Sequence, residues 1–200
     1  MIRQEVRSEM KAEKMTYFLE RSRRKTISLR IGEDGSLLVR APQWSSRREI
    51  EAFIEEKKDW IEKTRSEVLS EREKAKDQGF LTDREIRDLV QKALKVIPER
   101  VAYYAPLVGV TYGRITIRNQ RTRWGSCTAE GNLNFNCLLM LAPPEVLDSV
   151  VAHELCHRLE MNHSQRFYAE VHRVFPDYDR AHAWLKKEGR VLMERMKGGT

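Results

Sequence analysis

The pentapeptide from His153 to His157 constrains this chain more than any other segment, and it follows the apolar run VLDSVVA. A run of this kind predicts a buried helix. Because His153 and His157 are four residues apart, they lie one above the other on the same helical face. Burying two imidazoles and the carboxylate of Glu154 without partners would be costly. A metal ion shared by the two histidines removes that cost, so the sequence predicts a metal site.

Glu154 follows the first histidine and lies about 100° around the helix from it. This direction suits a carboxylate that hydrogen-bonds a zinc-bound water better than one that ligates the metal. Zinc lowers the pKa of such a water to about 7, and the carboxylate can take its proton. The predicted role of Glu154 is therefore that of the catalytic general base in a zinc-dependent hydrolase.

Catalytic zinc sites have three protein ligands and one open position. His163 is the predicted third ligand, because it has the spacing of the HExxHxxGxxH pattern. Glu160 occupies the glycine position of that pattern. We therefore expect Asn162 to turn the chain, since asparagine tolerates the left-handed conformation. Two alternative third ligands lie on the next predicted helix, namely Glu170 and His172.

The hydrophobic pattern predicts an α+β fold in three parts. Residues 1–44 form a β-rich subdomain, with a frayed end over 1–14 and a small antiparallel sheet that ends at Pro42. Residues 45–80 form a connecting helix, capped by Ser45 or Ser46, and a linker or frayed helix end over 70–79. Residues 81–200 form the domain that carries the histidine motif.

Within that domain, the pattern predicts a helix that begins at Thr82 or Asp83 and is kinked or restarted at Pro98. Two strands follow, and a connection over residues 121–131 joins them; we expect a small antiparallel sheet in this half of the chain. Three further helices follow these strands. The expected strands span 114–118 and 132–140; the expected helices span 143–160, begin at Ser164, and begin near Tyr178.

The bulk properties limit the setting of this domain. The formal net charge is +7, which can attract nucleic acid, nucleotides or acidic substrates. The three cysteines argue against a disulfide framework. The N-terminal sequence resembles no secretory signal, and no apolar run is long enough for a membrane helix. We therefore expect a cytoplasmic protein that does not enter a membrane.

Several polar residues outside the motif have both a structural and a functional interpretation. The stretch from Gly113 to Ala129 contains four arginines and no acidic residue, so it can bind phosphate or simply be solvated. The basic cluster at residues 21–25 can contact a polyanion or be a solvated edge. Trp124 and Gly125 either border the cleft or form a structural turn that needs a special backbone angle. The strand from Asn132 is a candidate edge for an extended peptide.

Three other side chains near the motif are lesser candidates. Tyr168 and His172 can stabilise transition-state charge, although each is more often a packed or surface residue. Cys156 points away from both histidines of the motif, so we expect it to be a packing residue.

The segments RTRWGSC, NLNFN and LAPPEVLDSVVAHELCHRLEMNHSQRFY resemble the YgjP-like metallopeptidase family, which is related to the SprT-like and WLM metallopeptidases. The resemblance covers essentially the whole chain, with its specific motifs between residues 121 and 185. It implies a zincin-like C-terminal half in which His153, His157 and His163 hold the metal and Glu154 is the general base. It leaves open the substrate, because some relatives resemble UTP pyrophosphatases and SprT-like proteins act on proteins attached to DNA.

Three functions are therefore compatible with the sequence. The first is a zinc-dependent metallopeptidase acting on protein or peptide. The second is a nucleoside-triphosphate (UTP) pyrophosphatase that uses the same metal site. The third is a non-enzymatic nucleic-acid binder with a structural metal, which is disfavoured because structural zinc sites are usually closed and rich in cysteine. The sequence does not indicate an oligomeric state.

Overall fold

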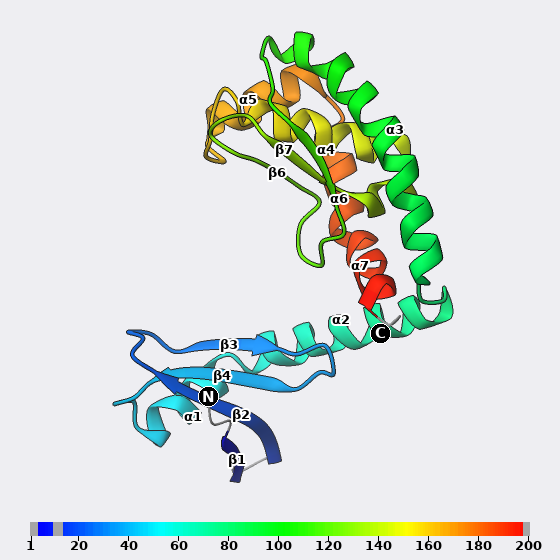
Figure 1. Cartoon of the computed structure of the whole chain (residues 1–200). Coiled ribbons are helices and arrows are strands. Elements are labelled where there is room, and N and C mark those ends of the chain that lie inside the picture. The colour runs from blue at the N-terminus through cyan, green and yellow to red at the C-terminus, as the bar shows by residue number, and fades with distance from the viewer. Residues whose placement is uncertain (1–3, 10–13, 198–200) are drawn as a thin grey trace. The chain divides into compact units, whose positions relative to one another are not determined.

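The computed structural model describes residues 4–9 and 14–197, and it shows a mixed α+β chain (Figure 1). The chain divides into two compact units, residues 1–74 and 75–200. The predicted α+β class is confirmed, and the predicted division into three segments stays a prediction. Of the helices described, none is both long and apolar enough to cross a membrane.

The first unit contains a four-stranded sheet of order β1-β2-β4-β3. Its strands are β1 (Gln4–Glu9), β2 (Lys14–Ser22), β3 (Ser28–Ile31) and β4 (Leu37–Pro42). The predicted sheet that ends at Pro42 corresponds to β2, β3 and β4, but β1 lies where we expected a frayed end. The prediction of a purely antiparallel sheet was wrong, since β2 and β4 are parallel. Alternating hydrophobicity fixes which face of a strand is buried, but it does not fix the direction of its neighbour.

One face of this sheet is covered by α1 (Arg47–Glu56) and α2 (Lys58–Asp77). Ser46 caps α1 through a capping box with Glu49, as its position predicted. Helix α2 continues to Asp77, through most of the segment predicted as a linker or frayed end, so that expectation was wrong. Buried residues of α1 and α2 pack with apolar strand residues into one core: Tyr17, Leu19, Leu37, Val39, Ala41, Ile50, Ile54 and Ile61.

The second unit begins with α3 (Asp83–Val108), which is capped by Thr82 through a second capping box with Glu85. The helix continues past Pro98 instead of restarting there, and it ends at Gly109 in the left-handed conformation. Its buried face includes Ala93, Ile97 and Val101.

A three-stranded sheet of order β5-β7-β6 follows. Its strands are β5 (Ile115–Arg118), β6 (Gly125–Cys127) and β7 (Leu133–Asn136). The pair β5 and β7 is parallel, so the expected antiparallel sheet is correct only for β6 and β7. The strand β6 falls inside the predicted connection and was missed, because three residues carry too little periodicity to recognise.

The predicted strand over 132–140 stops at Asn136 and becomes a short 3-10 helix, η1 (Cys137–Leu141). The side chain of Asn136 explains this change. Its Oδ1 accepts a hydrogen bond from the amide of Leu138 at 3.1 Å, and its Nδ2 donates to the carbonyls of Gln120 and Arg123. An amide side chain that bonds its own backbone in this way ends the strand.

Four helices complete the unit: α4 (Pro144–Cys156), α5 (Gln165–Val174), α6 (Tyr178–Lys187) and α7 (Gly189–Lys197). The last of them was not predicted. Arg100 of α3 joins Asp148 of α4 through two hydrogen bonds of 2.7 Å, which fixes one helix against the other. Helix α4 also contacts β6, so the histidine motif lies beside the sheet (Figure 1).

Candidate metal centre and adjoining pocket

Three histidines converge at the end of α4. His153 lies on the last turn of the helix, His157 is its C-terminal cap, and His163 lies in the connection to α5. The Nε2 atoms of His153 and His163 are 3.1 Å apart, and one ring nitrogen from each histidine lies within 4.8 Å of the others. The structure thus brings together all three residues that we predicted as ligands.

The connection that carries His163 uses a side-chain turn in place of a glycine. We expected Asn162 in the left-handed conformation, but none of the described non-glycine residues has a positive φ. Instead, Oδ1 of Asn162 accepts a hydrogen bond from the amide of Ser164 at 3.0 Å, and its Nδ2 donates to Glu160. An asparagine that bonds the backbone two residues further on replaces a backbone turn, so the chain reverses without the glycine of the longer pattern.

Two of the histidines are oriented through their second ring nitrogen. Nδ1 of His153 lies 2.8 Å from the hydroxyl of Tyr178, and Nδ1 of His157 lies 3.1 Å from the carbonyl of Glu160. Metal-ligating histidines are held in this way, with the other nitrogen bonded to a neighbouring group. In each ring Nε2 is left for a metal.

The surroundings keep the same two imidazoles neutral. Burial, followed by the neighbouring histidines His157 and His163, lowers the pKa of His153 to about 3. Burial also lowers the pKa of His157, which is 8% exposed. A neutral imidazole is the form that donates its lone pair to a metal.

These donors fit a zinc ion. A tetrahedral zinc ion with Zn–N bonds of about 2.1 Å holds its ligand nitrogens roughly 3.4 Å apart. The separation between His153 and His163 is 3.1 Å, close to this value, and the three nitrogens together lie within 4.8 Å, so small ring movements suffice to close the set around an ion. Three nitrogen donors with no thiolate leave one position open, as in catalytic sites.

Glu154 is almost completely buried beside this cluster, with 5% of its surface exposed. Burial raises the pKa of Glu154 to about 8, and the nearby charge of Arg123 acts in the opposite direction. A carboxyl with this pKa can both accept and release a proton near neutral pH.

Gly125, the first residue of β6, explains how Glu154 finds room. A Cβ atom placed on Gly125 would lie 2.5 Å from Oε1 of Glu154 and 2.7 Å from its Cγ. Gly125 is not among the described glycines that have positive φ. The expectation that it supplies a special backbone angle was therefore wrong, and its missing side chain makes space for the carboxylate.

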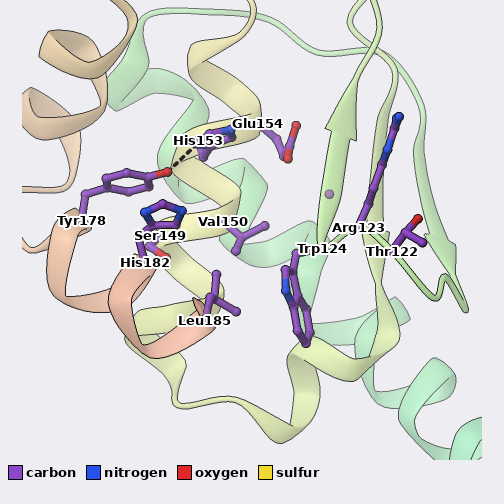
Figure 2. Close-up of a pocket in the computed structure, with 11 residues that line it drawn as sticks. Thr122, Arg123, Trp124, Ser149, Val150, His153, Glu154, Tyr178, His182 and Leu185 are labelled. Atoms are coloured by element: carbon purple, nitrogen blue, oxygen red, sulfur yellow. Dashed lines mark hydrogen bonds between the residues drawn. The ribbon is translucent and has the colours of Figure 1, made fainter. Parts of the chain in front are cut away.

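A pocket of about 250 Å³ opens beside His153 and Glu154. Figure 2 shows Tyr178 and His182 on one side of it and Arg123 and Thr122 on the other. The pocket is lined by Thr122, Arg123, Trp124, Gly125, Ser149, Val150, His153, Glu154, Tyr178, His182 and Leu185. The wall of the pocket therefore contains the Glu154 carboxylate and an apolar surface, and the cationic side chain of Arg123 lies at its rim.

The alternative third ligands lie outside the histidine cluster. Glu170 binds Arg173 at 2.7 Å, and His172 lies 3.3 Å from Asp179. Cys156 is fully buried, and burial raises the pKa of its thiol to about 12. It stays protonated and packs in the core.

The sequence analysis missed two residues of this site, Tyr178 and His182. Tyr178 was used only to mark the start of a helix, and no functional role was expected for His182. They are four residues apart on α6, and their rings stack with centroids 5.4 Å apart. Their i, i+4 spacing was a readable signal for a shared helical face, but nothing in the sequence indicated that this face meets α4.

Three converging histidines, with a buried carboxylate next to them on the same helix, define a candidate metal-hydrolase centre. The chain belongs to the YgjP-like metallopeptidase domain family, whose model matches residues 25–87 and 72–188. No curated protein matches the chain significantly.

Two solved structures are similar to part of the chain, and both are metallopeptidase zymogens. Abylysin of Pyrococcus abyssi is 19% identical; the match covers 48% of this chain and 97% of abylysin, with a TM-score of 0.43. Jannalysin of Methanocaldococcus jannaschii is 20% identical; the match covers 47% of this chain and 97% of jannalysin, with a TM-score of 0.42.

Proposed function

We propose that this protein is a zinc-dependent metallopeptidase with His153, His157 and His163 as metal ligands and Glu154 as general base. The observation that carries the proposal is the convergence of the three histidines with Glu154 buried beside them. Membership of a metallopeptidase family supports peptide hydrolysis as the reaction.

The side chains of the site divide the chemistry among them. A zinc ion, when bound, supplies Lewis acidity that polarises a carbonyl and acidifies water. Glu154 accepts the proton from the attacking water and returns it to the leaving amine. Tyr178 orients His153, and Arg123 stands at the rim of the pocket, where an oxygen that gains negative charge can be stabilised.

The edge strand β6 is the proposed track for an extended peptide. We expected the strand from Asn132 to serve as this edge, but β7 is the central strand of its sheet and both of its sides are paired. Strand β6 is at the edge, and Gly125 brings it directly against Glu154. An extended peptide can add to such an edge by main-chain hydrogen bonds, which would place its carbonyl groups next to the carboxylate.

The test is cleavage of unfolded casein by zinc-loaded protein. We expect the Glu154→Gln variant to lose at least about 100-fold of the rate, the scale of general base catalysis, while it keeps its zinc. Glu170→Gln, a half-buried carboxylate on α5 that lies outside the cluster, is the matched control and should keep the wild-type rate. Equal casein cleavage by wild type and Glu154→Gln would refute the proposal.

A nucleotide substrate is the second candidate, and Arg123 is the observation that favours it. Its guanidinium is exposed at the rim of the pocket, and arginine suits phosphate oxygens. Arg114 and Arg118, which we also considered as phosphate ligands, do not line this pocket. Pyrophosphate release from UTP that disappears in both Arg123→Gln and Glu154→Gln, without casein cleavage by wild type, would favour this function.

We also propose that the protein acts in the reducing cytoplasm. Cys127, Cys137 and Cys156 are all free thiols. Free buried thiols are typical of proteins from that compartment. Survival of activity in the presence of a thiol reductant would agree with this setting.

A further inference from the structure

The carboxyl ends of β2 and β4 lie side by side in the first unit. The two strands are parallel, with Ser22 opposite Pro42, and the amide of Gln43 donates to the carbonyl of Ser22 at 3.1 Å. The chain then crosses the end of β4, because β3 begins with Ser28 opposite Arg40. The connector 23–27 and the turn 43–46 therefore share one end of the sheet.

This end of the sheet is strongly basic. Arg23 and Lys25 of the connector are exposed, Arg24 is half-buried, and Arg47 and Arg48 begin α1 exposed beside the turn. Residues 21–28 and 42–48 contain six basic side chains and no acidic one: Arg21, Arg23, Arg24, Lys25, Arg47 and Arg48. We call this set, together with Trp44, the basic end.

The acidic residues of the adjoining chain lie elsewhere or are occupied. Glu33 and Asp34 lie in the turn before β4, at the opposite end of that strand. Glu20, near the end of β2, pairs with Arg40 at 2.9 Å. Glu49 is held in the capping box of Ser46, and Glu51 pairs with Arg47 at 2.7 Å. The positive charge of Arg23, Arg24, Lys25 and Arg48 is thus not balanced by a neighbouring carboxylate that the structure describes at this end.

Trp44 lies in the turn 43–46, and its indole ring is exposed to solvent. It is 69% exposed, the highest value among the large apolar side chains that the structure describes. The guanidinium of Arg21 holds this turn, because its NH1 donates to the carbonyls of Pro42, Gln43 and Ser45 at 2.7–3.1 Å. A rigid turn presents the indole as a flat, preorganised surface.

Arg24 is a second indication that this end of the sheet binds an anion. Its Nε is buried and has no hydrogen-bond partner within the described part of the chain. A buried donor without a partner is costly, and an anion that accepts its hydrogen bond removes the cost.

We propose that the basic end binds single-stranded nucleic acid, with Trp44 stacking on a base and Arg23, Arg24, Lys25 and Arg48 contacting phosphates. Stacking platforms combined with backbone-binding cations are the general means of binding single strands. An acidic peptide would satisfy the charges without the indole. An anionic membrane can take up an indole at its interface, but Trp44 is the one exposed large apolar side chain that the structure describes within residues 21–28 and 42–48, which leaves a membrane little apolar area to bury. This surface belongs to the first unit and is independent of the histidine centre.

The test measures binding of the full-length, zinc-loaded protein to a fluorescent single strand of roughly 12 nucleotides, a length within the usual site size. We expect Trp44→Ala to weaken binding by about tenfold, the scale of one lost stacked base. The triple variant Arg23→Ser, Arg24→Ser, Lys25→Ser should weaken it further and lower the salt slope by about 2, since single strands contribute roughly 0.7 per phosphate contact.

The matched control removes the same charge from an exposed part of α3, in Arg84→Ser, Arg87→Ser, Lys95→Ser. This variant should bind within about twofold of wild type, because its charges belong to the second unit and are not part of the proposed surface. Trp44→Phe keeps an aromatic ring and should restore most of the binding that Trp44→Ala loses.

Three results would overturn the proposal. The first is no binding of the strand by wild type at about 50 mM salt, where phosphate contacts are strongest. The second is an equal loss in the α3 control, which would indicate general charge attraction. The third is unchanged affinity in Trp44→Ala together with tighter binding of duplex DNA, a polyglutamate peptide or phosphatidylglycerol vesicles.

Discussion

The hydroxyl of Tyr178 lies 2.8 Å from Nδ1 of His153, and this contact leaves Nε2 of His153 facing His163. With a metal on Nε2, Nδ1 carries the proton and donates a hydrogen bond to the hydroxyl oxygen of Tyr178. The tyrosine thereby fixes both the tautomer and the direction of a proposed ligand.

Replacing Tyr178 with phenylalanine should therefore weaken zinc binding by about tenfold, the lower range for loss of such a partner. The reason is that the imidazole of His153 would no longer be held in one orientation. A competition titration against a zinc-binding dye measures the change. Tyr103→Phe, at an exposed position on α3, is the control and should keep wild-type affinity. Equal affinity in wild type and Tyr178→Phe would show that packing alone orients His153.

Gly125→Ala should lower the rate of peptide cleavage by at least about tenfold, given that a displaced general base forfeits part of its contribution. The added Cβ would lie 2.5 Å from Oε1 of Glu154, so the carboxylate must move. Zinc content should stay at the wild-type level, since the three atoms nearest the added Cβ all belong to Glu154 and none to a histidine. Steady-state kinetics and metal analysis on the same samples check both statements.

Ser126→Ala, at the next residue of β6, provides the control for Gly125→Ala. It loses one hydrogen bond with Asn134 but adds no atom beside Glu154. Its rate should stay within about twofold of wild type, since a side-chain hydrogen bond contributes only about 1 kcal/mol to stability. If both variants lose activity equally, disturbance of the strand would explain the effect, and contact with Glu154 would not.

The histidine motif and the caps were predictable because local chemistry decides them. The spacing of His153 and His157 defines a helical face without knowledge of the rest of the fold. Thr82 and Glu85 form a capping box from residues three apart, so the start of α3 could also be read directly.

Strand direction and the remote side of the pocket were not predictable, because distant packing decides them. The parallel pairing of β2 and β4 depends on where the chain crosses, which no local pattern encodes. Tyr178 is 25 residues from His153 along the chain, yet the two side chains are in contact. Gly125 was recognised as important, but the reason became visible only when Glu154 was seen next to it.

Between pH 6.5 and pH 8 the metal-free protein should lose about 1.7 kcal/mol more stability than Glu154→Gln, because a folded-state proton that is half released at pH 8 corresponds to roughly 1.2 pH units at 1.4 kcal/mol each. Burial raises the pKa of Glu154 to about 8, so over this range the folded state holds a proton that the unfolded state has released. Stability must then fall as the pH rises.

The histidines act in the opposite direction, and they do so equally in wild type and Glu154→Gln. The pKa of His153 is lowered to about 3, and the pKa values of His157 and His182 are also lowered. They bind fewer protons in the folded state, so stability rises with pH until their unfolded pKa near 6.5 is passed. Urea unfolding of metal-free wild type and Glu154→Gln at both pH values isolates the carboxyl. The variant should show no such loss, and an equal loss in both proteins would assign it to another group.

His163→Ala should weaken zinc binding by roughly 100-fold or more, because loss of a direct ligand should exceed loss of an outer partner. His172→Ala should leave the affinity within about twofold, since His172 faces Asp179 at the surface and lies outside the cluster. The two variants remove the same side chain type from neighbouring parts of the chain, and dye competition at pH 7.5 compares them. The opposite result, with a larger loss in His172→Ala, would make α5 the source of the third ligand. It would also mean that His153 and His163 lie close together only because their rings pack in the metal-free protein.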